Sequence, residues 1–140
     1  MNIFYLDNDT KKCATMHLDK HCVKMILEYC QLLSTAHRVL DGKETVEKSK
    51  TGRNVKRWIL ESDLNNVLYS ATHINHPSAV WCRASTANYK WLHSLLVELC
   101  SEYTYRYGKI HKCEEIGLVK ALGTTPQNIS NKPFTEPTPA

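Results

Sequence analysis

The sequence contains no apolar run long enough to cross a lipid bilayer, no C-x-x-C pair and no lipidation signal. A membrane-spanning helix needs about 20 mostly apolar residues in a row, and zinc fingers hold their metal with closely spaced cysteine pairs. We therefore expect neither a membrane protein nor a zinc finger. A length of 140 residues fits one domain over residues 1–140.

No signal peptide precedes the cysteines, and most of them lie within helical apolar patterns. Disulfide frameworks belong to secreted chains, where the compartment is oxidising. We therefore expect reduced thiols in a cytosol. The cysteines are Cys13, Cys22, Cys30, Cys82, Cys100 and Cys113.

Acidic residues are scarce in the segment 41–57, where six Lys and Arg side chains stand between Gly42 and Arg57 against two Glu. This excess equals the net charge of the whole chain, +4. The segment also contains Gly42 and Gly52, and we interpret it as a basic loop or insertion. It either attracts phosphates through a salt-sensitive field or is a solvated surface loop without a partner.

Apolar residues at three-to-four spacing predict two long helices, over about residues 19–40 and 79–105. The apolar run 2–6 is typical of a short strand or an extended arm. Residues 124–140 hold four of the five prolines, so we expect an extended tail that wraps the domain or a partner. The predicted fold is all-α, an orthogonal helical bundle with these two terminal segments.

Charged and polar side chains share one face of the first long helix: His17, His21, Lys24 and Glu28, with Lys20 at its edge. Two histidines four residues apart can bind a metal, but the neighbouring lysines would repel a cation. Imidazole and ammonium groups donate hydrogen bonds to phosphate oxygens. We favour an anion and expect no metal. The alternative is an exposed polar stripe with one buried histidine.

A second cluster surrounds the start of the other long helix and contains His73, His76, Trp81, Arg83 and Asn88. A helix N-terminus presents free backbone N–H groups to an anion, and an arginine one turn further on would complete a phosphate clamp. An aromatic plane beside a side-chain amide suits a nucleobase. Trp81 can equally be a core residue.

Four stretches of the sequence, 17–28, 33–38, 76–92 and 102–109, resemble a family of small, uncharacterised helical proteins of tailed bacteriophages. The resemblance covers nearly the whole chain. It implies a protein that acts in the cytoplasm of an infected bacterium, in nucleic-acid metabolism or in disarming host defences.

A more distant likeness is to phage pyrimidine-dimer DNA glycosylases of the endonuclease V type. These enzymes attack the damaged sugar with an N-terminal amine and use a glutamate on a long helix near a histidine. The likeness implies that Glu28, with His17 or His21, would match that pair.

Together, the two clusters predict a pocket between the long helices that binds a phosphate-bearing nucleotide. Our first hypothesis is a protein that sequesters a nucleotide signal of bacterial antiviral defence. The second is an enzyme acting on the same ligand, with His21, His76 and Glu28 as candidate catalytic groups. The third is a DNA repair glycosylase. We expect no cofactor, and a homo-oligomer is compatible with each hypothesis.

Overall fold

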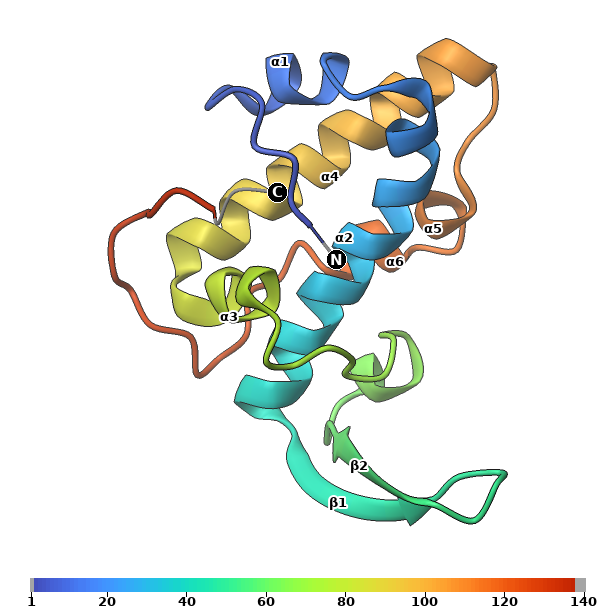
Figure 1. Cartoon of the computed structure of the whole chain (residues 1–140), viewed down its shortest axis with the longest axis vertical. Helices are drawn as coiled ribbons and strands as arrows, with labels where there is room; N and C mark the ends of the chain where they lie inside the picture. The colour runs from blue at the N-terminus through green and yellow to red at the C-terminus, as the bar shows by residue number, and fades with distance from the viewer. Residues whose placement is uncertain (1, 138–140) are drawn as a thin grey trace.

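The computed structural model describes residues 2–137 and is built around two long helices, α2 (Asp19–Asp41) and α4 (Thr86–Tyr107) (Figure 1). The remaining elements are short. They are α1 (Thr10–Thr15), β1 (Lys43–Lys48), β2 (Asn54–Ile59), the 3-10 helix η1 (Asp63–Asn66), α3 (Pro77–Ala84), α5 (Lys112–Glu115) and α6 (Leu118–Ala121).

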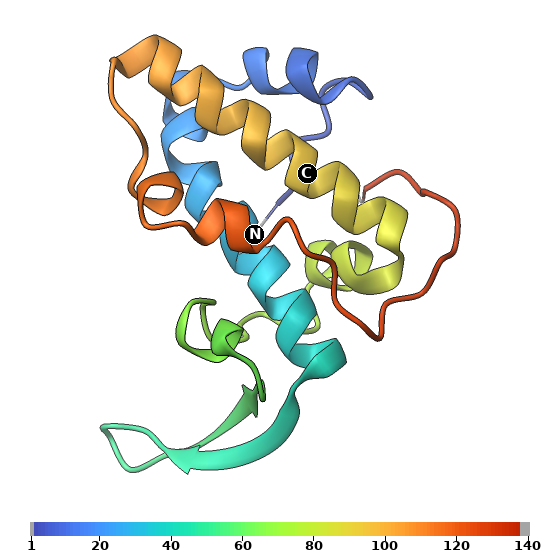
Figure 2. The ribbon, with the colours of Figure 1, turned by 180° about the vertical axis from the view of Figure 1, so that it is seen from behind.

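The two long helices run in opposite directions and are inclined to each other, which differs from the predicted orthogonal packing (Figure 2). Arg106, at the end of α4, contacts Asp19 at the start of α2. At the opposite ends, His37 Nε2 lies 2.8 Å from Tyr89 Oη. Helices of this length could not be joined at both ends by side chains if they crossed at right angles.

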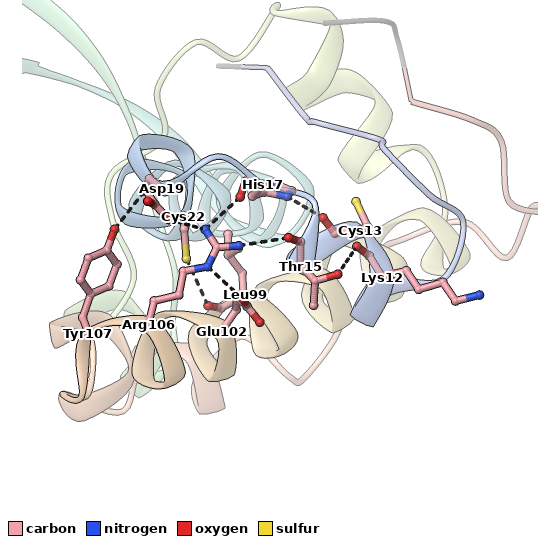
Figure 3. A network of polar contacts seen from close by, with 10 residues as sticks. All are labelled: Lys12, Cys13, Thr15, His17, Asp19, Cys22, Leu99, Glu102, Arg106 and Tyr107. Atoms are coloured by element: carbon pink, nitrogen blue, oxygen red, sulfur yellow. Dashed lines mark hydrogen bonds and ion pairs between the residues drawn. The ribbon is translucent and has the colours of Figure 1, made fainter.

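Arg106 fixes the start of α2 and the end of α1 to α4 (Figure 3). Its guanidinium donates to the carbonyl oxygens of Thr15 and His17, at 3.1 and 2.9 Å. It also pairs with the carboxylates of Asp19, at 3.0 Å, and Glu102, at 2.9 Å. The bond to Thr15 O satisfies a carbonyl that the end of α1 leaves without an intrahelical partner, and the bond to His17 O holds the link between α1 and α2.

The all-α prediction is wrong, because most of the segment predicted as a basic loop forms an antiparallel hairpin. β1 pairs with β2 in a register from Lys43 opposite Ile59 to Lys48 opposite Asn54. The chain is therefore mostly helical with a two-stranded sheet. Strands are recognised in a sequence by apolar alternation. Nearly every residue of β1 is exposed, so that signal is missing.

The predicted helix over residues 79–105 is two helices, α3 and α4, separated at Ser85. Ser85 has extended backbone angles, φ −157° and ψ 156°, and its hydroxyl accepts a hydrogen bond from Asn88 N at 3.1 Å. A serine that caps a new helix in this way ends the previous one. The apolar spacing continues across the break and so concealed it.

The terminal segments pack on the helices as extended chain. In the N-terminal arm, Ile3 is buried and Phe4 N donates to Tyr29 Oη at 3.2 Å. The arm pairs with neither strand. The C-terminal tail crosses α3 and α4, where Thr86 N donates to Ser130 O at 2.7 Å. The part of the predicted tail over residues 138–140 lies outside the described residues.

The core lies between the helices, and all six cysteines belong to it as free thiols. Over residues 2–137, we find no helix that combines the length and apolar character needed to cross a membrane.

Candidate functional site

A cavity of about 640 Å³ opens between α2, the segment that precedes α3, and α5. Small-molecule sites usually measure about 300 to 1,000 Å³. Its lining combines charged, hydrogen-bonding and apolar side chains from these three parts of the chain. They are Val23, Lys24, Leu27, Glu28, Gln31, Tyr69, His73, His111, Lys112, Cys113 and Ile116.

The polar wall of the cavity contains basic side chains from each of the three parts. Lys24 on α2 lies 3.7 Å from the carboxylate of Glu28, one turn further along the helix. His73 enters from the segment before α3, and its φ of 47° is uncommon for a residue other than glycine. His111 and Lys112 come from the start of α5. Positive φ angles such as that of His73 occur often at binding sites.

The apolar wall consists of three side chains that remain exposed to solvent. Val23 is 43%, Leu27 39% and Ile116 58% exposed. Scattered exposed apolar residues are normal, but these three line one cavity. Apolar surface next to a few polar groups is the usual composition of a ligand pocket.

A hydrogen-bonded thiol group also lines the cavity. Cys113 Sγ lies 3.7 Å from Tyr69 Oη. Hydrogen bonding from the Cys30 thiol lowers the pKa of Cys113 to about 6, and the Tyr69 hydroxyl and His111 act in the same direction. Burial and this contact raise the pKa of Tyr69 to about 12, so its hydroxyl stays protonated and can donate.

Of the residues predicted on α2, Lys24 and Glu28 line the cavity. Lys20 is exposed and lies outside the lining. His21 stacks on Phe4, with ring centroids 4.3 Å apart and planes at 17°.

His17, which precedes α2, is buried in the core. Its Nδ1 donates to Cys13 O at 2.7 Å, and its Nε2 accepts from Tyr29 Oη at 2.9 Å. Both ring nitrogens are therefore used. No group of three or more His, Cys, Asp or Glu side chains within residues 2–137 is placed to hold a metal.

The residues of the second predicted cluster do not converge, since only His73 reaches the cavity. His76 caps α3, where its Nδ1 accepts from Ser78 N at 3.1 Å. Trp81 is a core residue, and its Nε1 donates to Thr135 O at 2.9 Å. Asn88 is buried and binds the C-terminal tail.

Arg83 is half-buried, and burial lowers the pKa of its guanidinium. Its Nη1 is buried without a hydrogen-bond partner in the described part of the chain. Arg83 lies outside the cavity lining. The predicted pocket between the two long helices is therefore replaced by core packing, and the observed cavity lies on another side of α2.

Tyr69, Lys112 and Cys113 were not predicted as site residues. The sequence also did not indicate that His111 lies close to α2. The chain returns to α2 after α4 because Gly108 ends that helix with a φ of 66°. Gly117, with a φ of 84°, then separates α5 from α6. These glycines mark turns in the sequence, but the helix face to which the chain returns depends on tertiary packing.

No family model matches the chain, and neither a curated protein nor a solved structure is significantly similar to it.

Proposed function

We propose that the cavity beside α2 binds a phosphate-bearing nucleotide. The observation that supports this most strongly is the meeting of Lys24, His73, His111 and Lys112, from three separate parts of the chain, around one cavity that also contains Tyr69. Phosphates are bound by cationic and hydrogen-bonding donors, and nucleobases by flat or apolar surfaces.

The two walls of the cavity suit the two ends of such a ligand. The ammonium groups of Lys24 and Lys112 and the imidazoles of His73 and His111 are the phosphate donors. The apolar side chains and the ring of Tyr69 offer a surface for the base. Gln31 supplies an amide that can pair with either edge of a base.

The biological role that we infer is interference with a nucleotide signal of bacterial antiviral defence, in the cytoplasm of an infected bacterium. It rests on the cavity and on the resemblance of stretches such as 17–28 and 76–92 to bacteriophage proteins. The protein would sequester the signal or cleave it, and a homo-oligomer could do either.

A panel of mononucleotides and cyclic dinucleotides tests the proposal by calorimetry. Lys24→Ala and Lys112→Ala each remove a charge-assisted hydrogen bond of about 1.5 to 3 kcal/mol, so affinity should fall about tenfold to a hundredfold. Lys20→Ala is the matched control, because Lys20 is exposed on the same helix and lies outside the cavity. Equal affinity in all three variants, or no binding in the panel, would refute the proposal.

Incubation with the bound nucleotide, followed by heat denaturation and chromatography, separates the two modes of action. Release of intact ligand means sequestration, and release of an altered ligand means cleavage. If cleavage is found, Glu28→Gln is the first variant to assay, since Glu28 is the carboxylate of the cavity.

A DNA repair glycosylase is the second candidate, and the position of Glu28 in this cavity favours it. In that mechanism Glu28 would carry protons for an attacking N-terminal amine. Residue 1 lies outside the described residues. Borohydride trapping on dimer-containing DNA tests this candidate. A covalent adduct that is lost in Glu28→Gln would establish it, and absence of an adduct would remove it.

A further inference from the structure

The hairpin β1–β2 contributes little to the core. Most of its residues are exposed, including the apolar side chain of Val46, at 61%. It projects from the end of α2, away from α1 and α4 (Figures 1 and 2). A two-stranded hairpin alone is at most marginally stable in water. Its order must therefore come from contacts at its ends.

The base of the hairpin is attached to α2 by a buried arginine. Arg38 Nη1 donates to Trp58 O at 2.8 Å and to Asn65 Oδ1 at 2.9 Å. The same Asn65 oxygen accepts from Leu60 N at 3.1 Å. At the other strand, a Cβ on Gly42 would collide with Arg38 O, so the chain leaves α2 through a close approach that requires glycine.

The tip of the hairpin is ordered by its own hydrogen bonds. Ser49 N donates to Arg53 O at 2.8 Å, and Gly52 N donates to Ser49 O at 2.9 Å. The hydroxyl of Ser49 accepts from Arg53 N at 3.2 Å. With both ends fixed, the two strands of the hairpin hold a defined register.

Charge is concentrated toward that tip. The stretch 48–60 contains no Asp or Glu and carries five cations, Lys48, Lys50, Arg53, Lys56 and Arg57. One of them, Lys56, pairs with Glu44 at 3.3 Å. Side chains alternate between the faces of a strand. Lys56 therefore lies on one face and Arg57 on the other, while Lys50 and Arg53 lie at the tip.

We propose that this hairpin docks, tip first, into the major groove of double-stranded DNA. That groove is about 12 Å wide and about 8.5 Å deep and admits a two-stranded ribbon. Six residues at about 3.3 Å each make strands of about 20 Å, longer than the groove is deep. One face carries Lys56 and the other carries the half-buried Arg57, which lines a cavity with Glu47. Cations on the two faces can meet the two phosphate walls, whereas a flat anionic membrane would meet one face.

This docking goes beyond nucleotide binding, because it uses a different part of the molecule and a polymeric partner. The major groove of A-form RNA is too narrow and deep for such a ribbon. DNA in the B form is therefore the partner that the hairpin fits.

Fluorescence anisotropy with a labelled 20-base-pair DNA duplex, titrated at several NaCl concentrations, tests the docking. The ribbon variant is Lys48→Ser/Lys50→Ser/Arg53→Ser. The control variant, Lys90→Ser/Lys120→Ser/Lys132→Ser, removes the same charge from exposed positions outside the hairpin. Circular dichroism verifies that both remain folded.

The wild-type chain should bind the duplex with a salt dependence that the ribbon variant largely loses. Three phosphate contacts contribute about 2.7 to the slope of log K against log[salt], so the slope should flatten by about that amount. Affinity at low salt should fall at least tenfold. The control variant should stay within about threefold of the wild type.

Three results would overturn the docking: no duplex binding at low salt, equal losses in the two variants, or hairpin-dependent binding to anionic phospholipid vesicles without binding to DNA. Mononucleotide affinity, measured in the same ribbon variant, keeps this outcome separate from the cavity. It should stay unchanged whether or not the hairpin binds DNA.

Discussion

Asn88 and Thr135 are joined by two hydrogen bonds. Thr135 N donates to Asn88 Oδ1 at 3.0 Å, and Asn88 Nδ2 donates to Thr135 Oγ1 at 3.1 Å. The same Nδ2 also donates to Trp81 O at 3.0 Å. Both N–H groups and the oxygen of the Asn88 side chain therefore form hydrogen bonds within the protein. Asn88 attaches the tail to α4 and does not serve as a contact for a base.

Asn88→Ala should therefore destabilise the protein and release its tail. It leaves Thr135 N and Trp81 O without partners, and the expected loss in the free energy of unfolding is about 1 to 3 kcal/mol. Thr135→Val removes only the bond to Oγ1 and should cost less. Urea denaturation measures the stability, and limited proteolysis measures release. An intact, protease-resistant tail in Asn88→Ala would contradict this account.

Asn88 shows which features of the structure could be predicted from the sequence and which could not. That Asn88 lies in a helix was predicted correctly, because apolar spacing depends on local periodicity, but the start of that helix at Thr86 was missed. The role of Asn88 was not predicted. The same amide group can form hydrogen bonds to a ligand or to a distant segment of the chain, and the sequence does not distinguish the two. Trp81 and His17 show the same ambiguity, and both turned out to be buried.

The parts of the site that could be predicted are those on one helix. Lys24 and Glu28 are four residues apart, and helical geometry alone places them on one face. Tyr69 and Cys113 reach the same cavity from segments that lack strong periodicity. Their convergence depends on long-range packing, for which a single sequence carries no direct signal.

Acid should destabilise the fold because two histidines are buried as neutral groups. Burial lowers the pKa of both His17 and His37 below the unfolded value. The unfolded chain therefore takes up protons below about pH 6.5 that the folded chain does not. Stability is complete above that pH and is lost as the pH falls, by up to about 1.4 kcal/mol per pH unit for each histidine.

Thermal unfolding between pH 5 and 8 measures this loss. His17→Gln and His37→Gln replace a titrating ring with a neutral amide, so each variant should show a shallower decline of melting temperature with acid than the wild type. His21→Gln is the control, because His21 lies half-exposed against Phe4. An identical pH dependence in His17→Gln, His37→Gln and the wild type would contradict the assignment.

Arg38 should be among the most sensitive positions in the chain. Besides its bonds at the base of the hairpin, it donates to Tyr69 O at 2.6 Å, Asn65 O at 2.9 Å and Leu68 O at 2.9 Å. Arg38→Lys keeps the charge but cannot reproduce the planar arrangement of donors. Several buried carbonyls lose their partner, and we expect a loss of about 2 to 4 kcal/mol.

Hydrogen exchange locates the effect of Arg38→Lys. Amides of β1 and β2 should exchange faster, while those in the middle of α4 should change only in proportion to global stability. The exposed Arg53→Lys, at the tip, serves as the control. Unchanged protection of the hairpin amides would show that Arg38 does not anchor it.

Cys113 should react with iodoacetamide at lower pH than the other cysteines. Its pKa is lowered to about 6, so the thiolate that acts as nucleophile is present at neutral pH. Burial raises the pKa of Cys13, Cys22, Cys82 and Cys100, and hydrogen bonding to Cys113 raises that of Cys30. Alkylation of Cys113 should therefore begin at a lower pH than alkylation of the other five cysteines.

Peptide mass spectrometry measures all six cysteines in one sample, so the other five are internal controls. Tyr69→Phe removes a donor to the thiolate and should move the Cys113 profile to higher pH. Because Cys113 lines the cavity, a bound nucleotide should also slow its alkylation without affecting the denatured protein. Uniform labelling at pH 7 would contradict the lowered pKa. Labelling that a saturating nucleotide leaves unchanged would place that ligand outside this cavity.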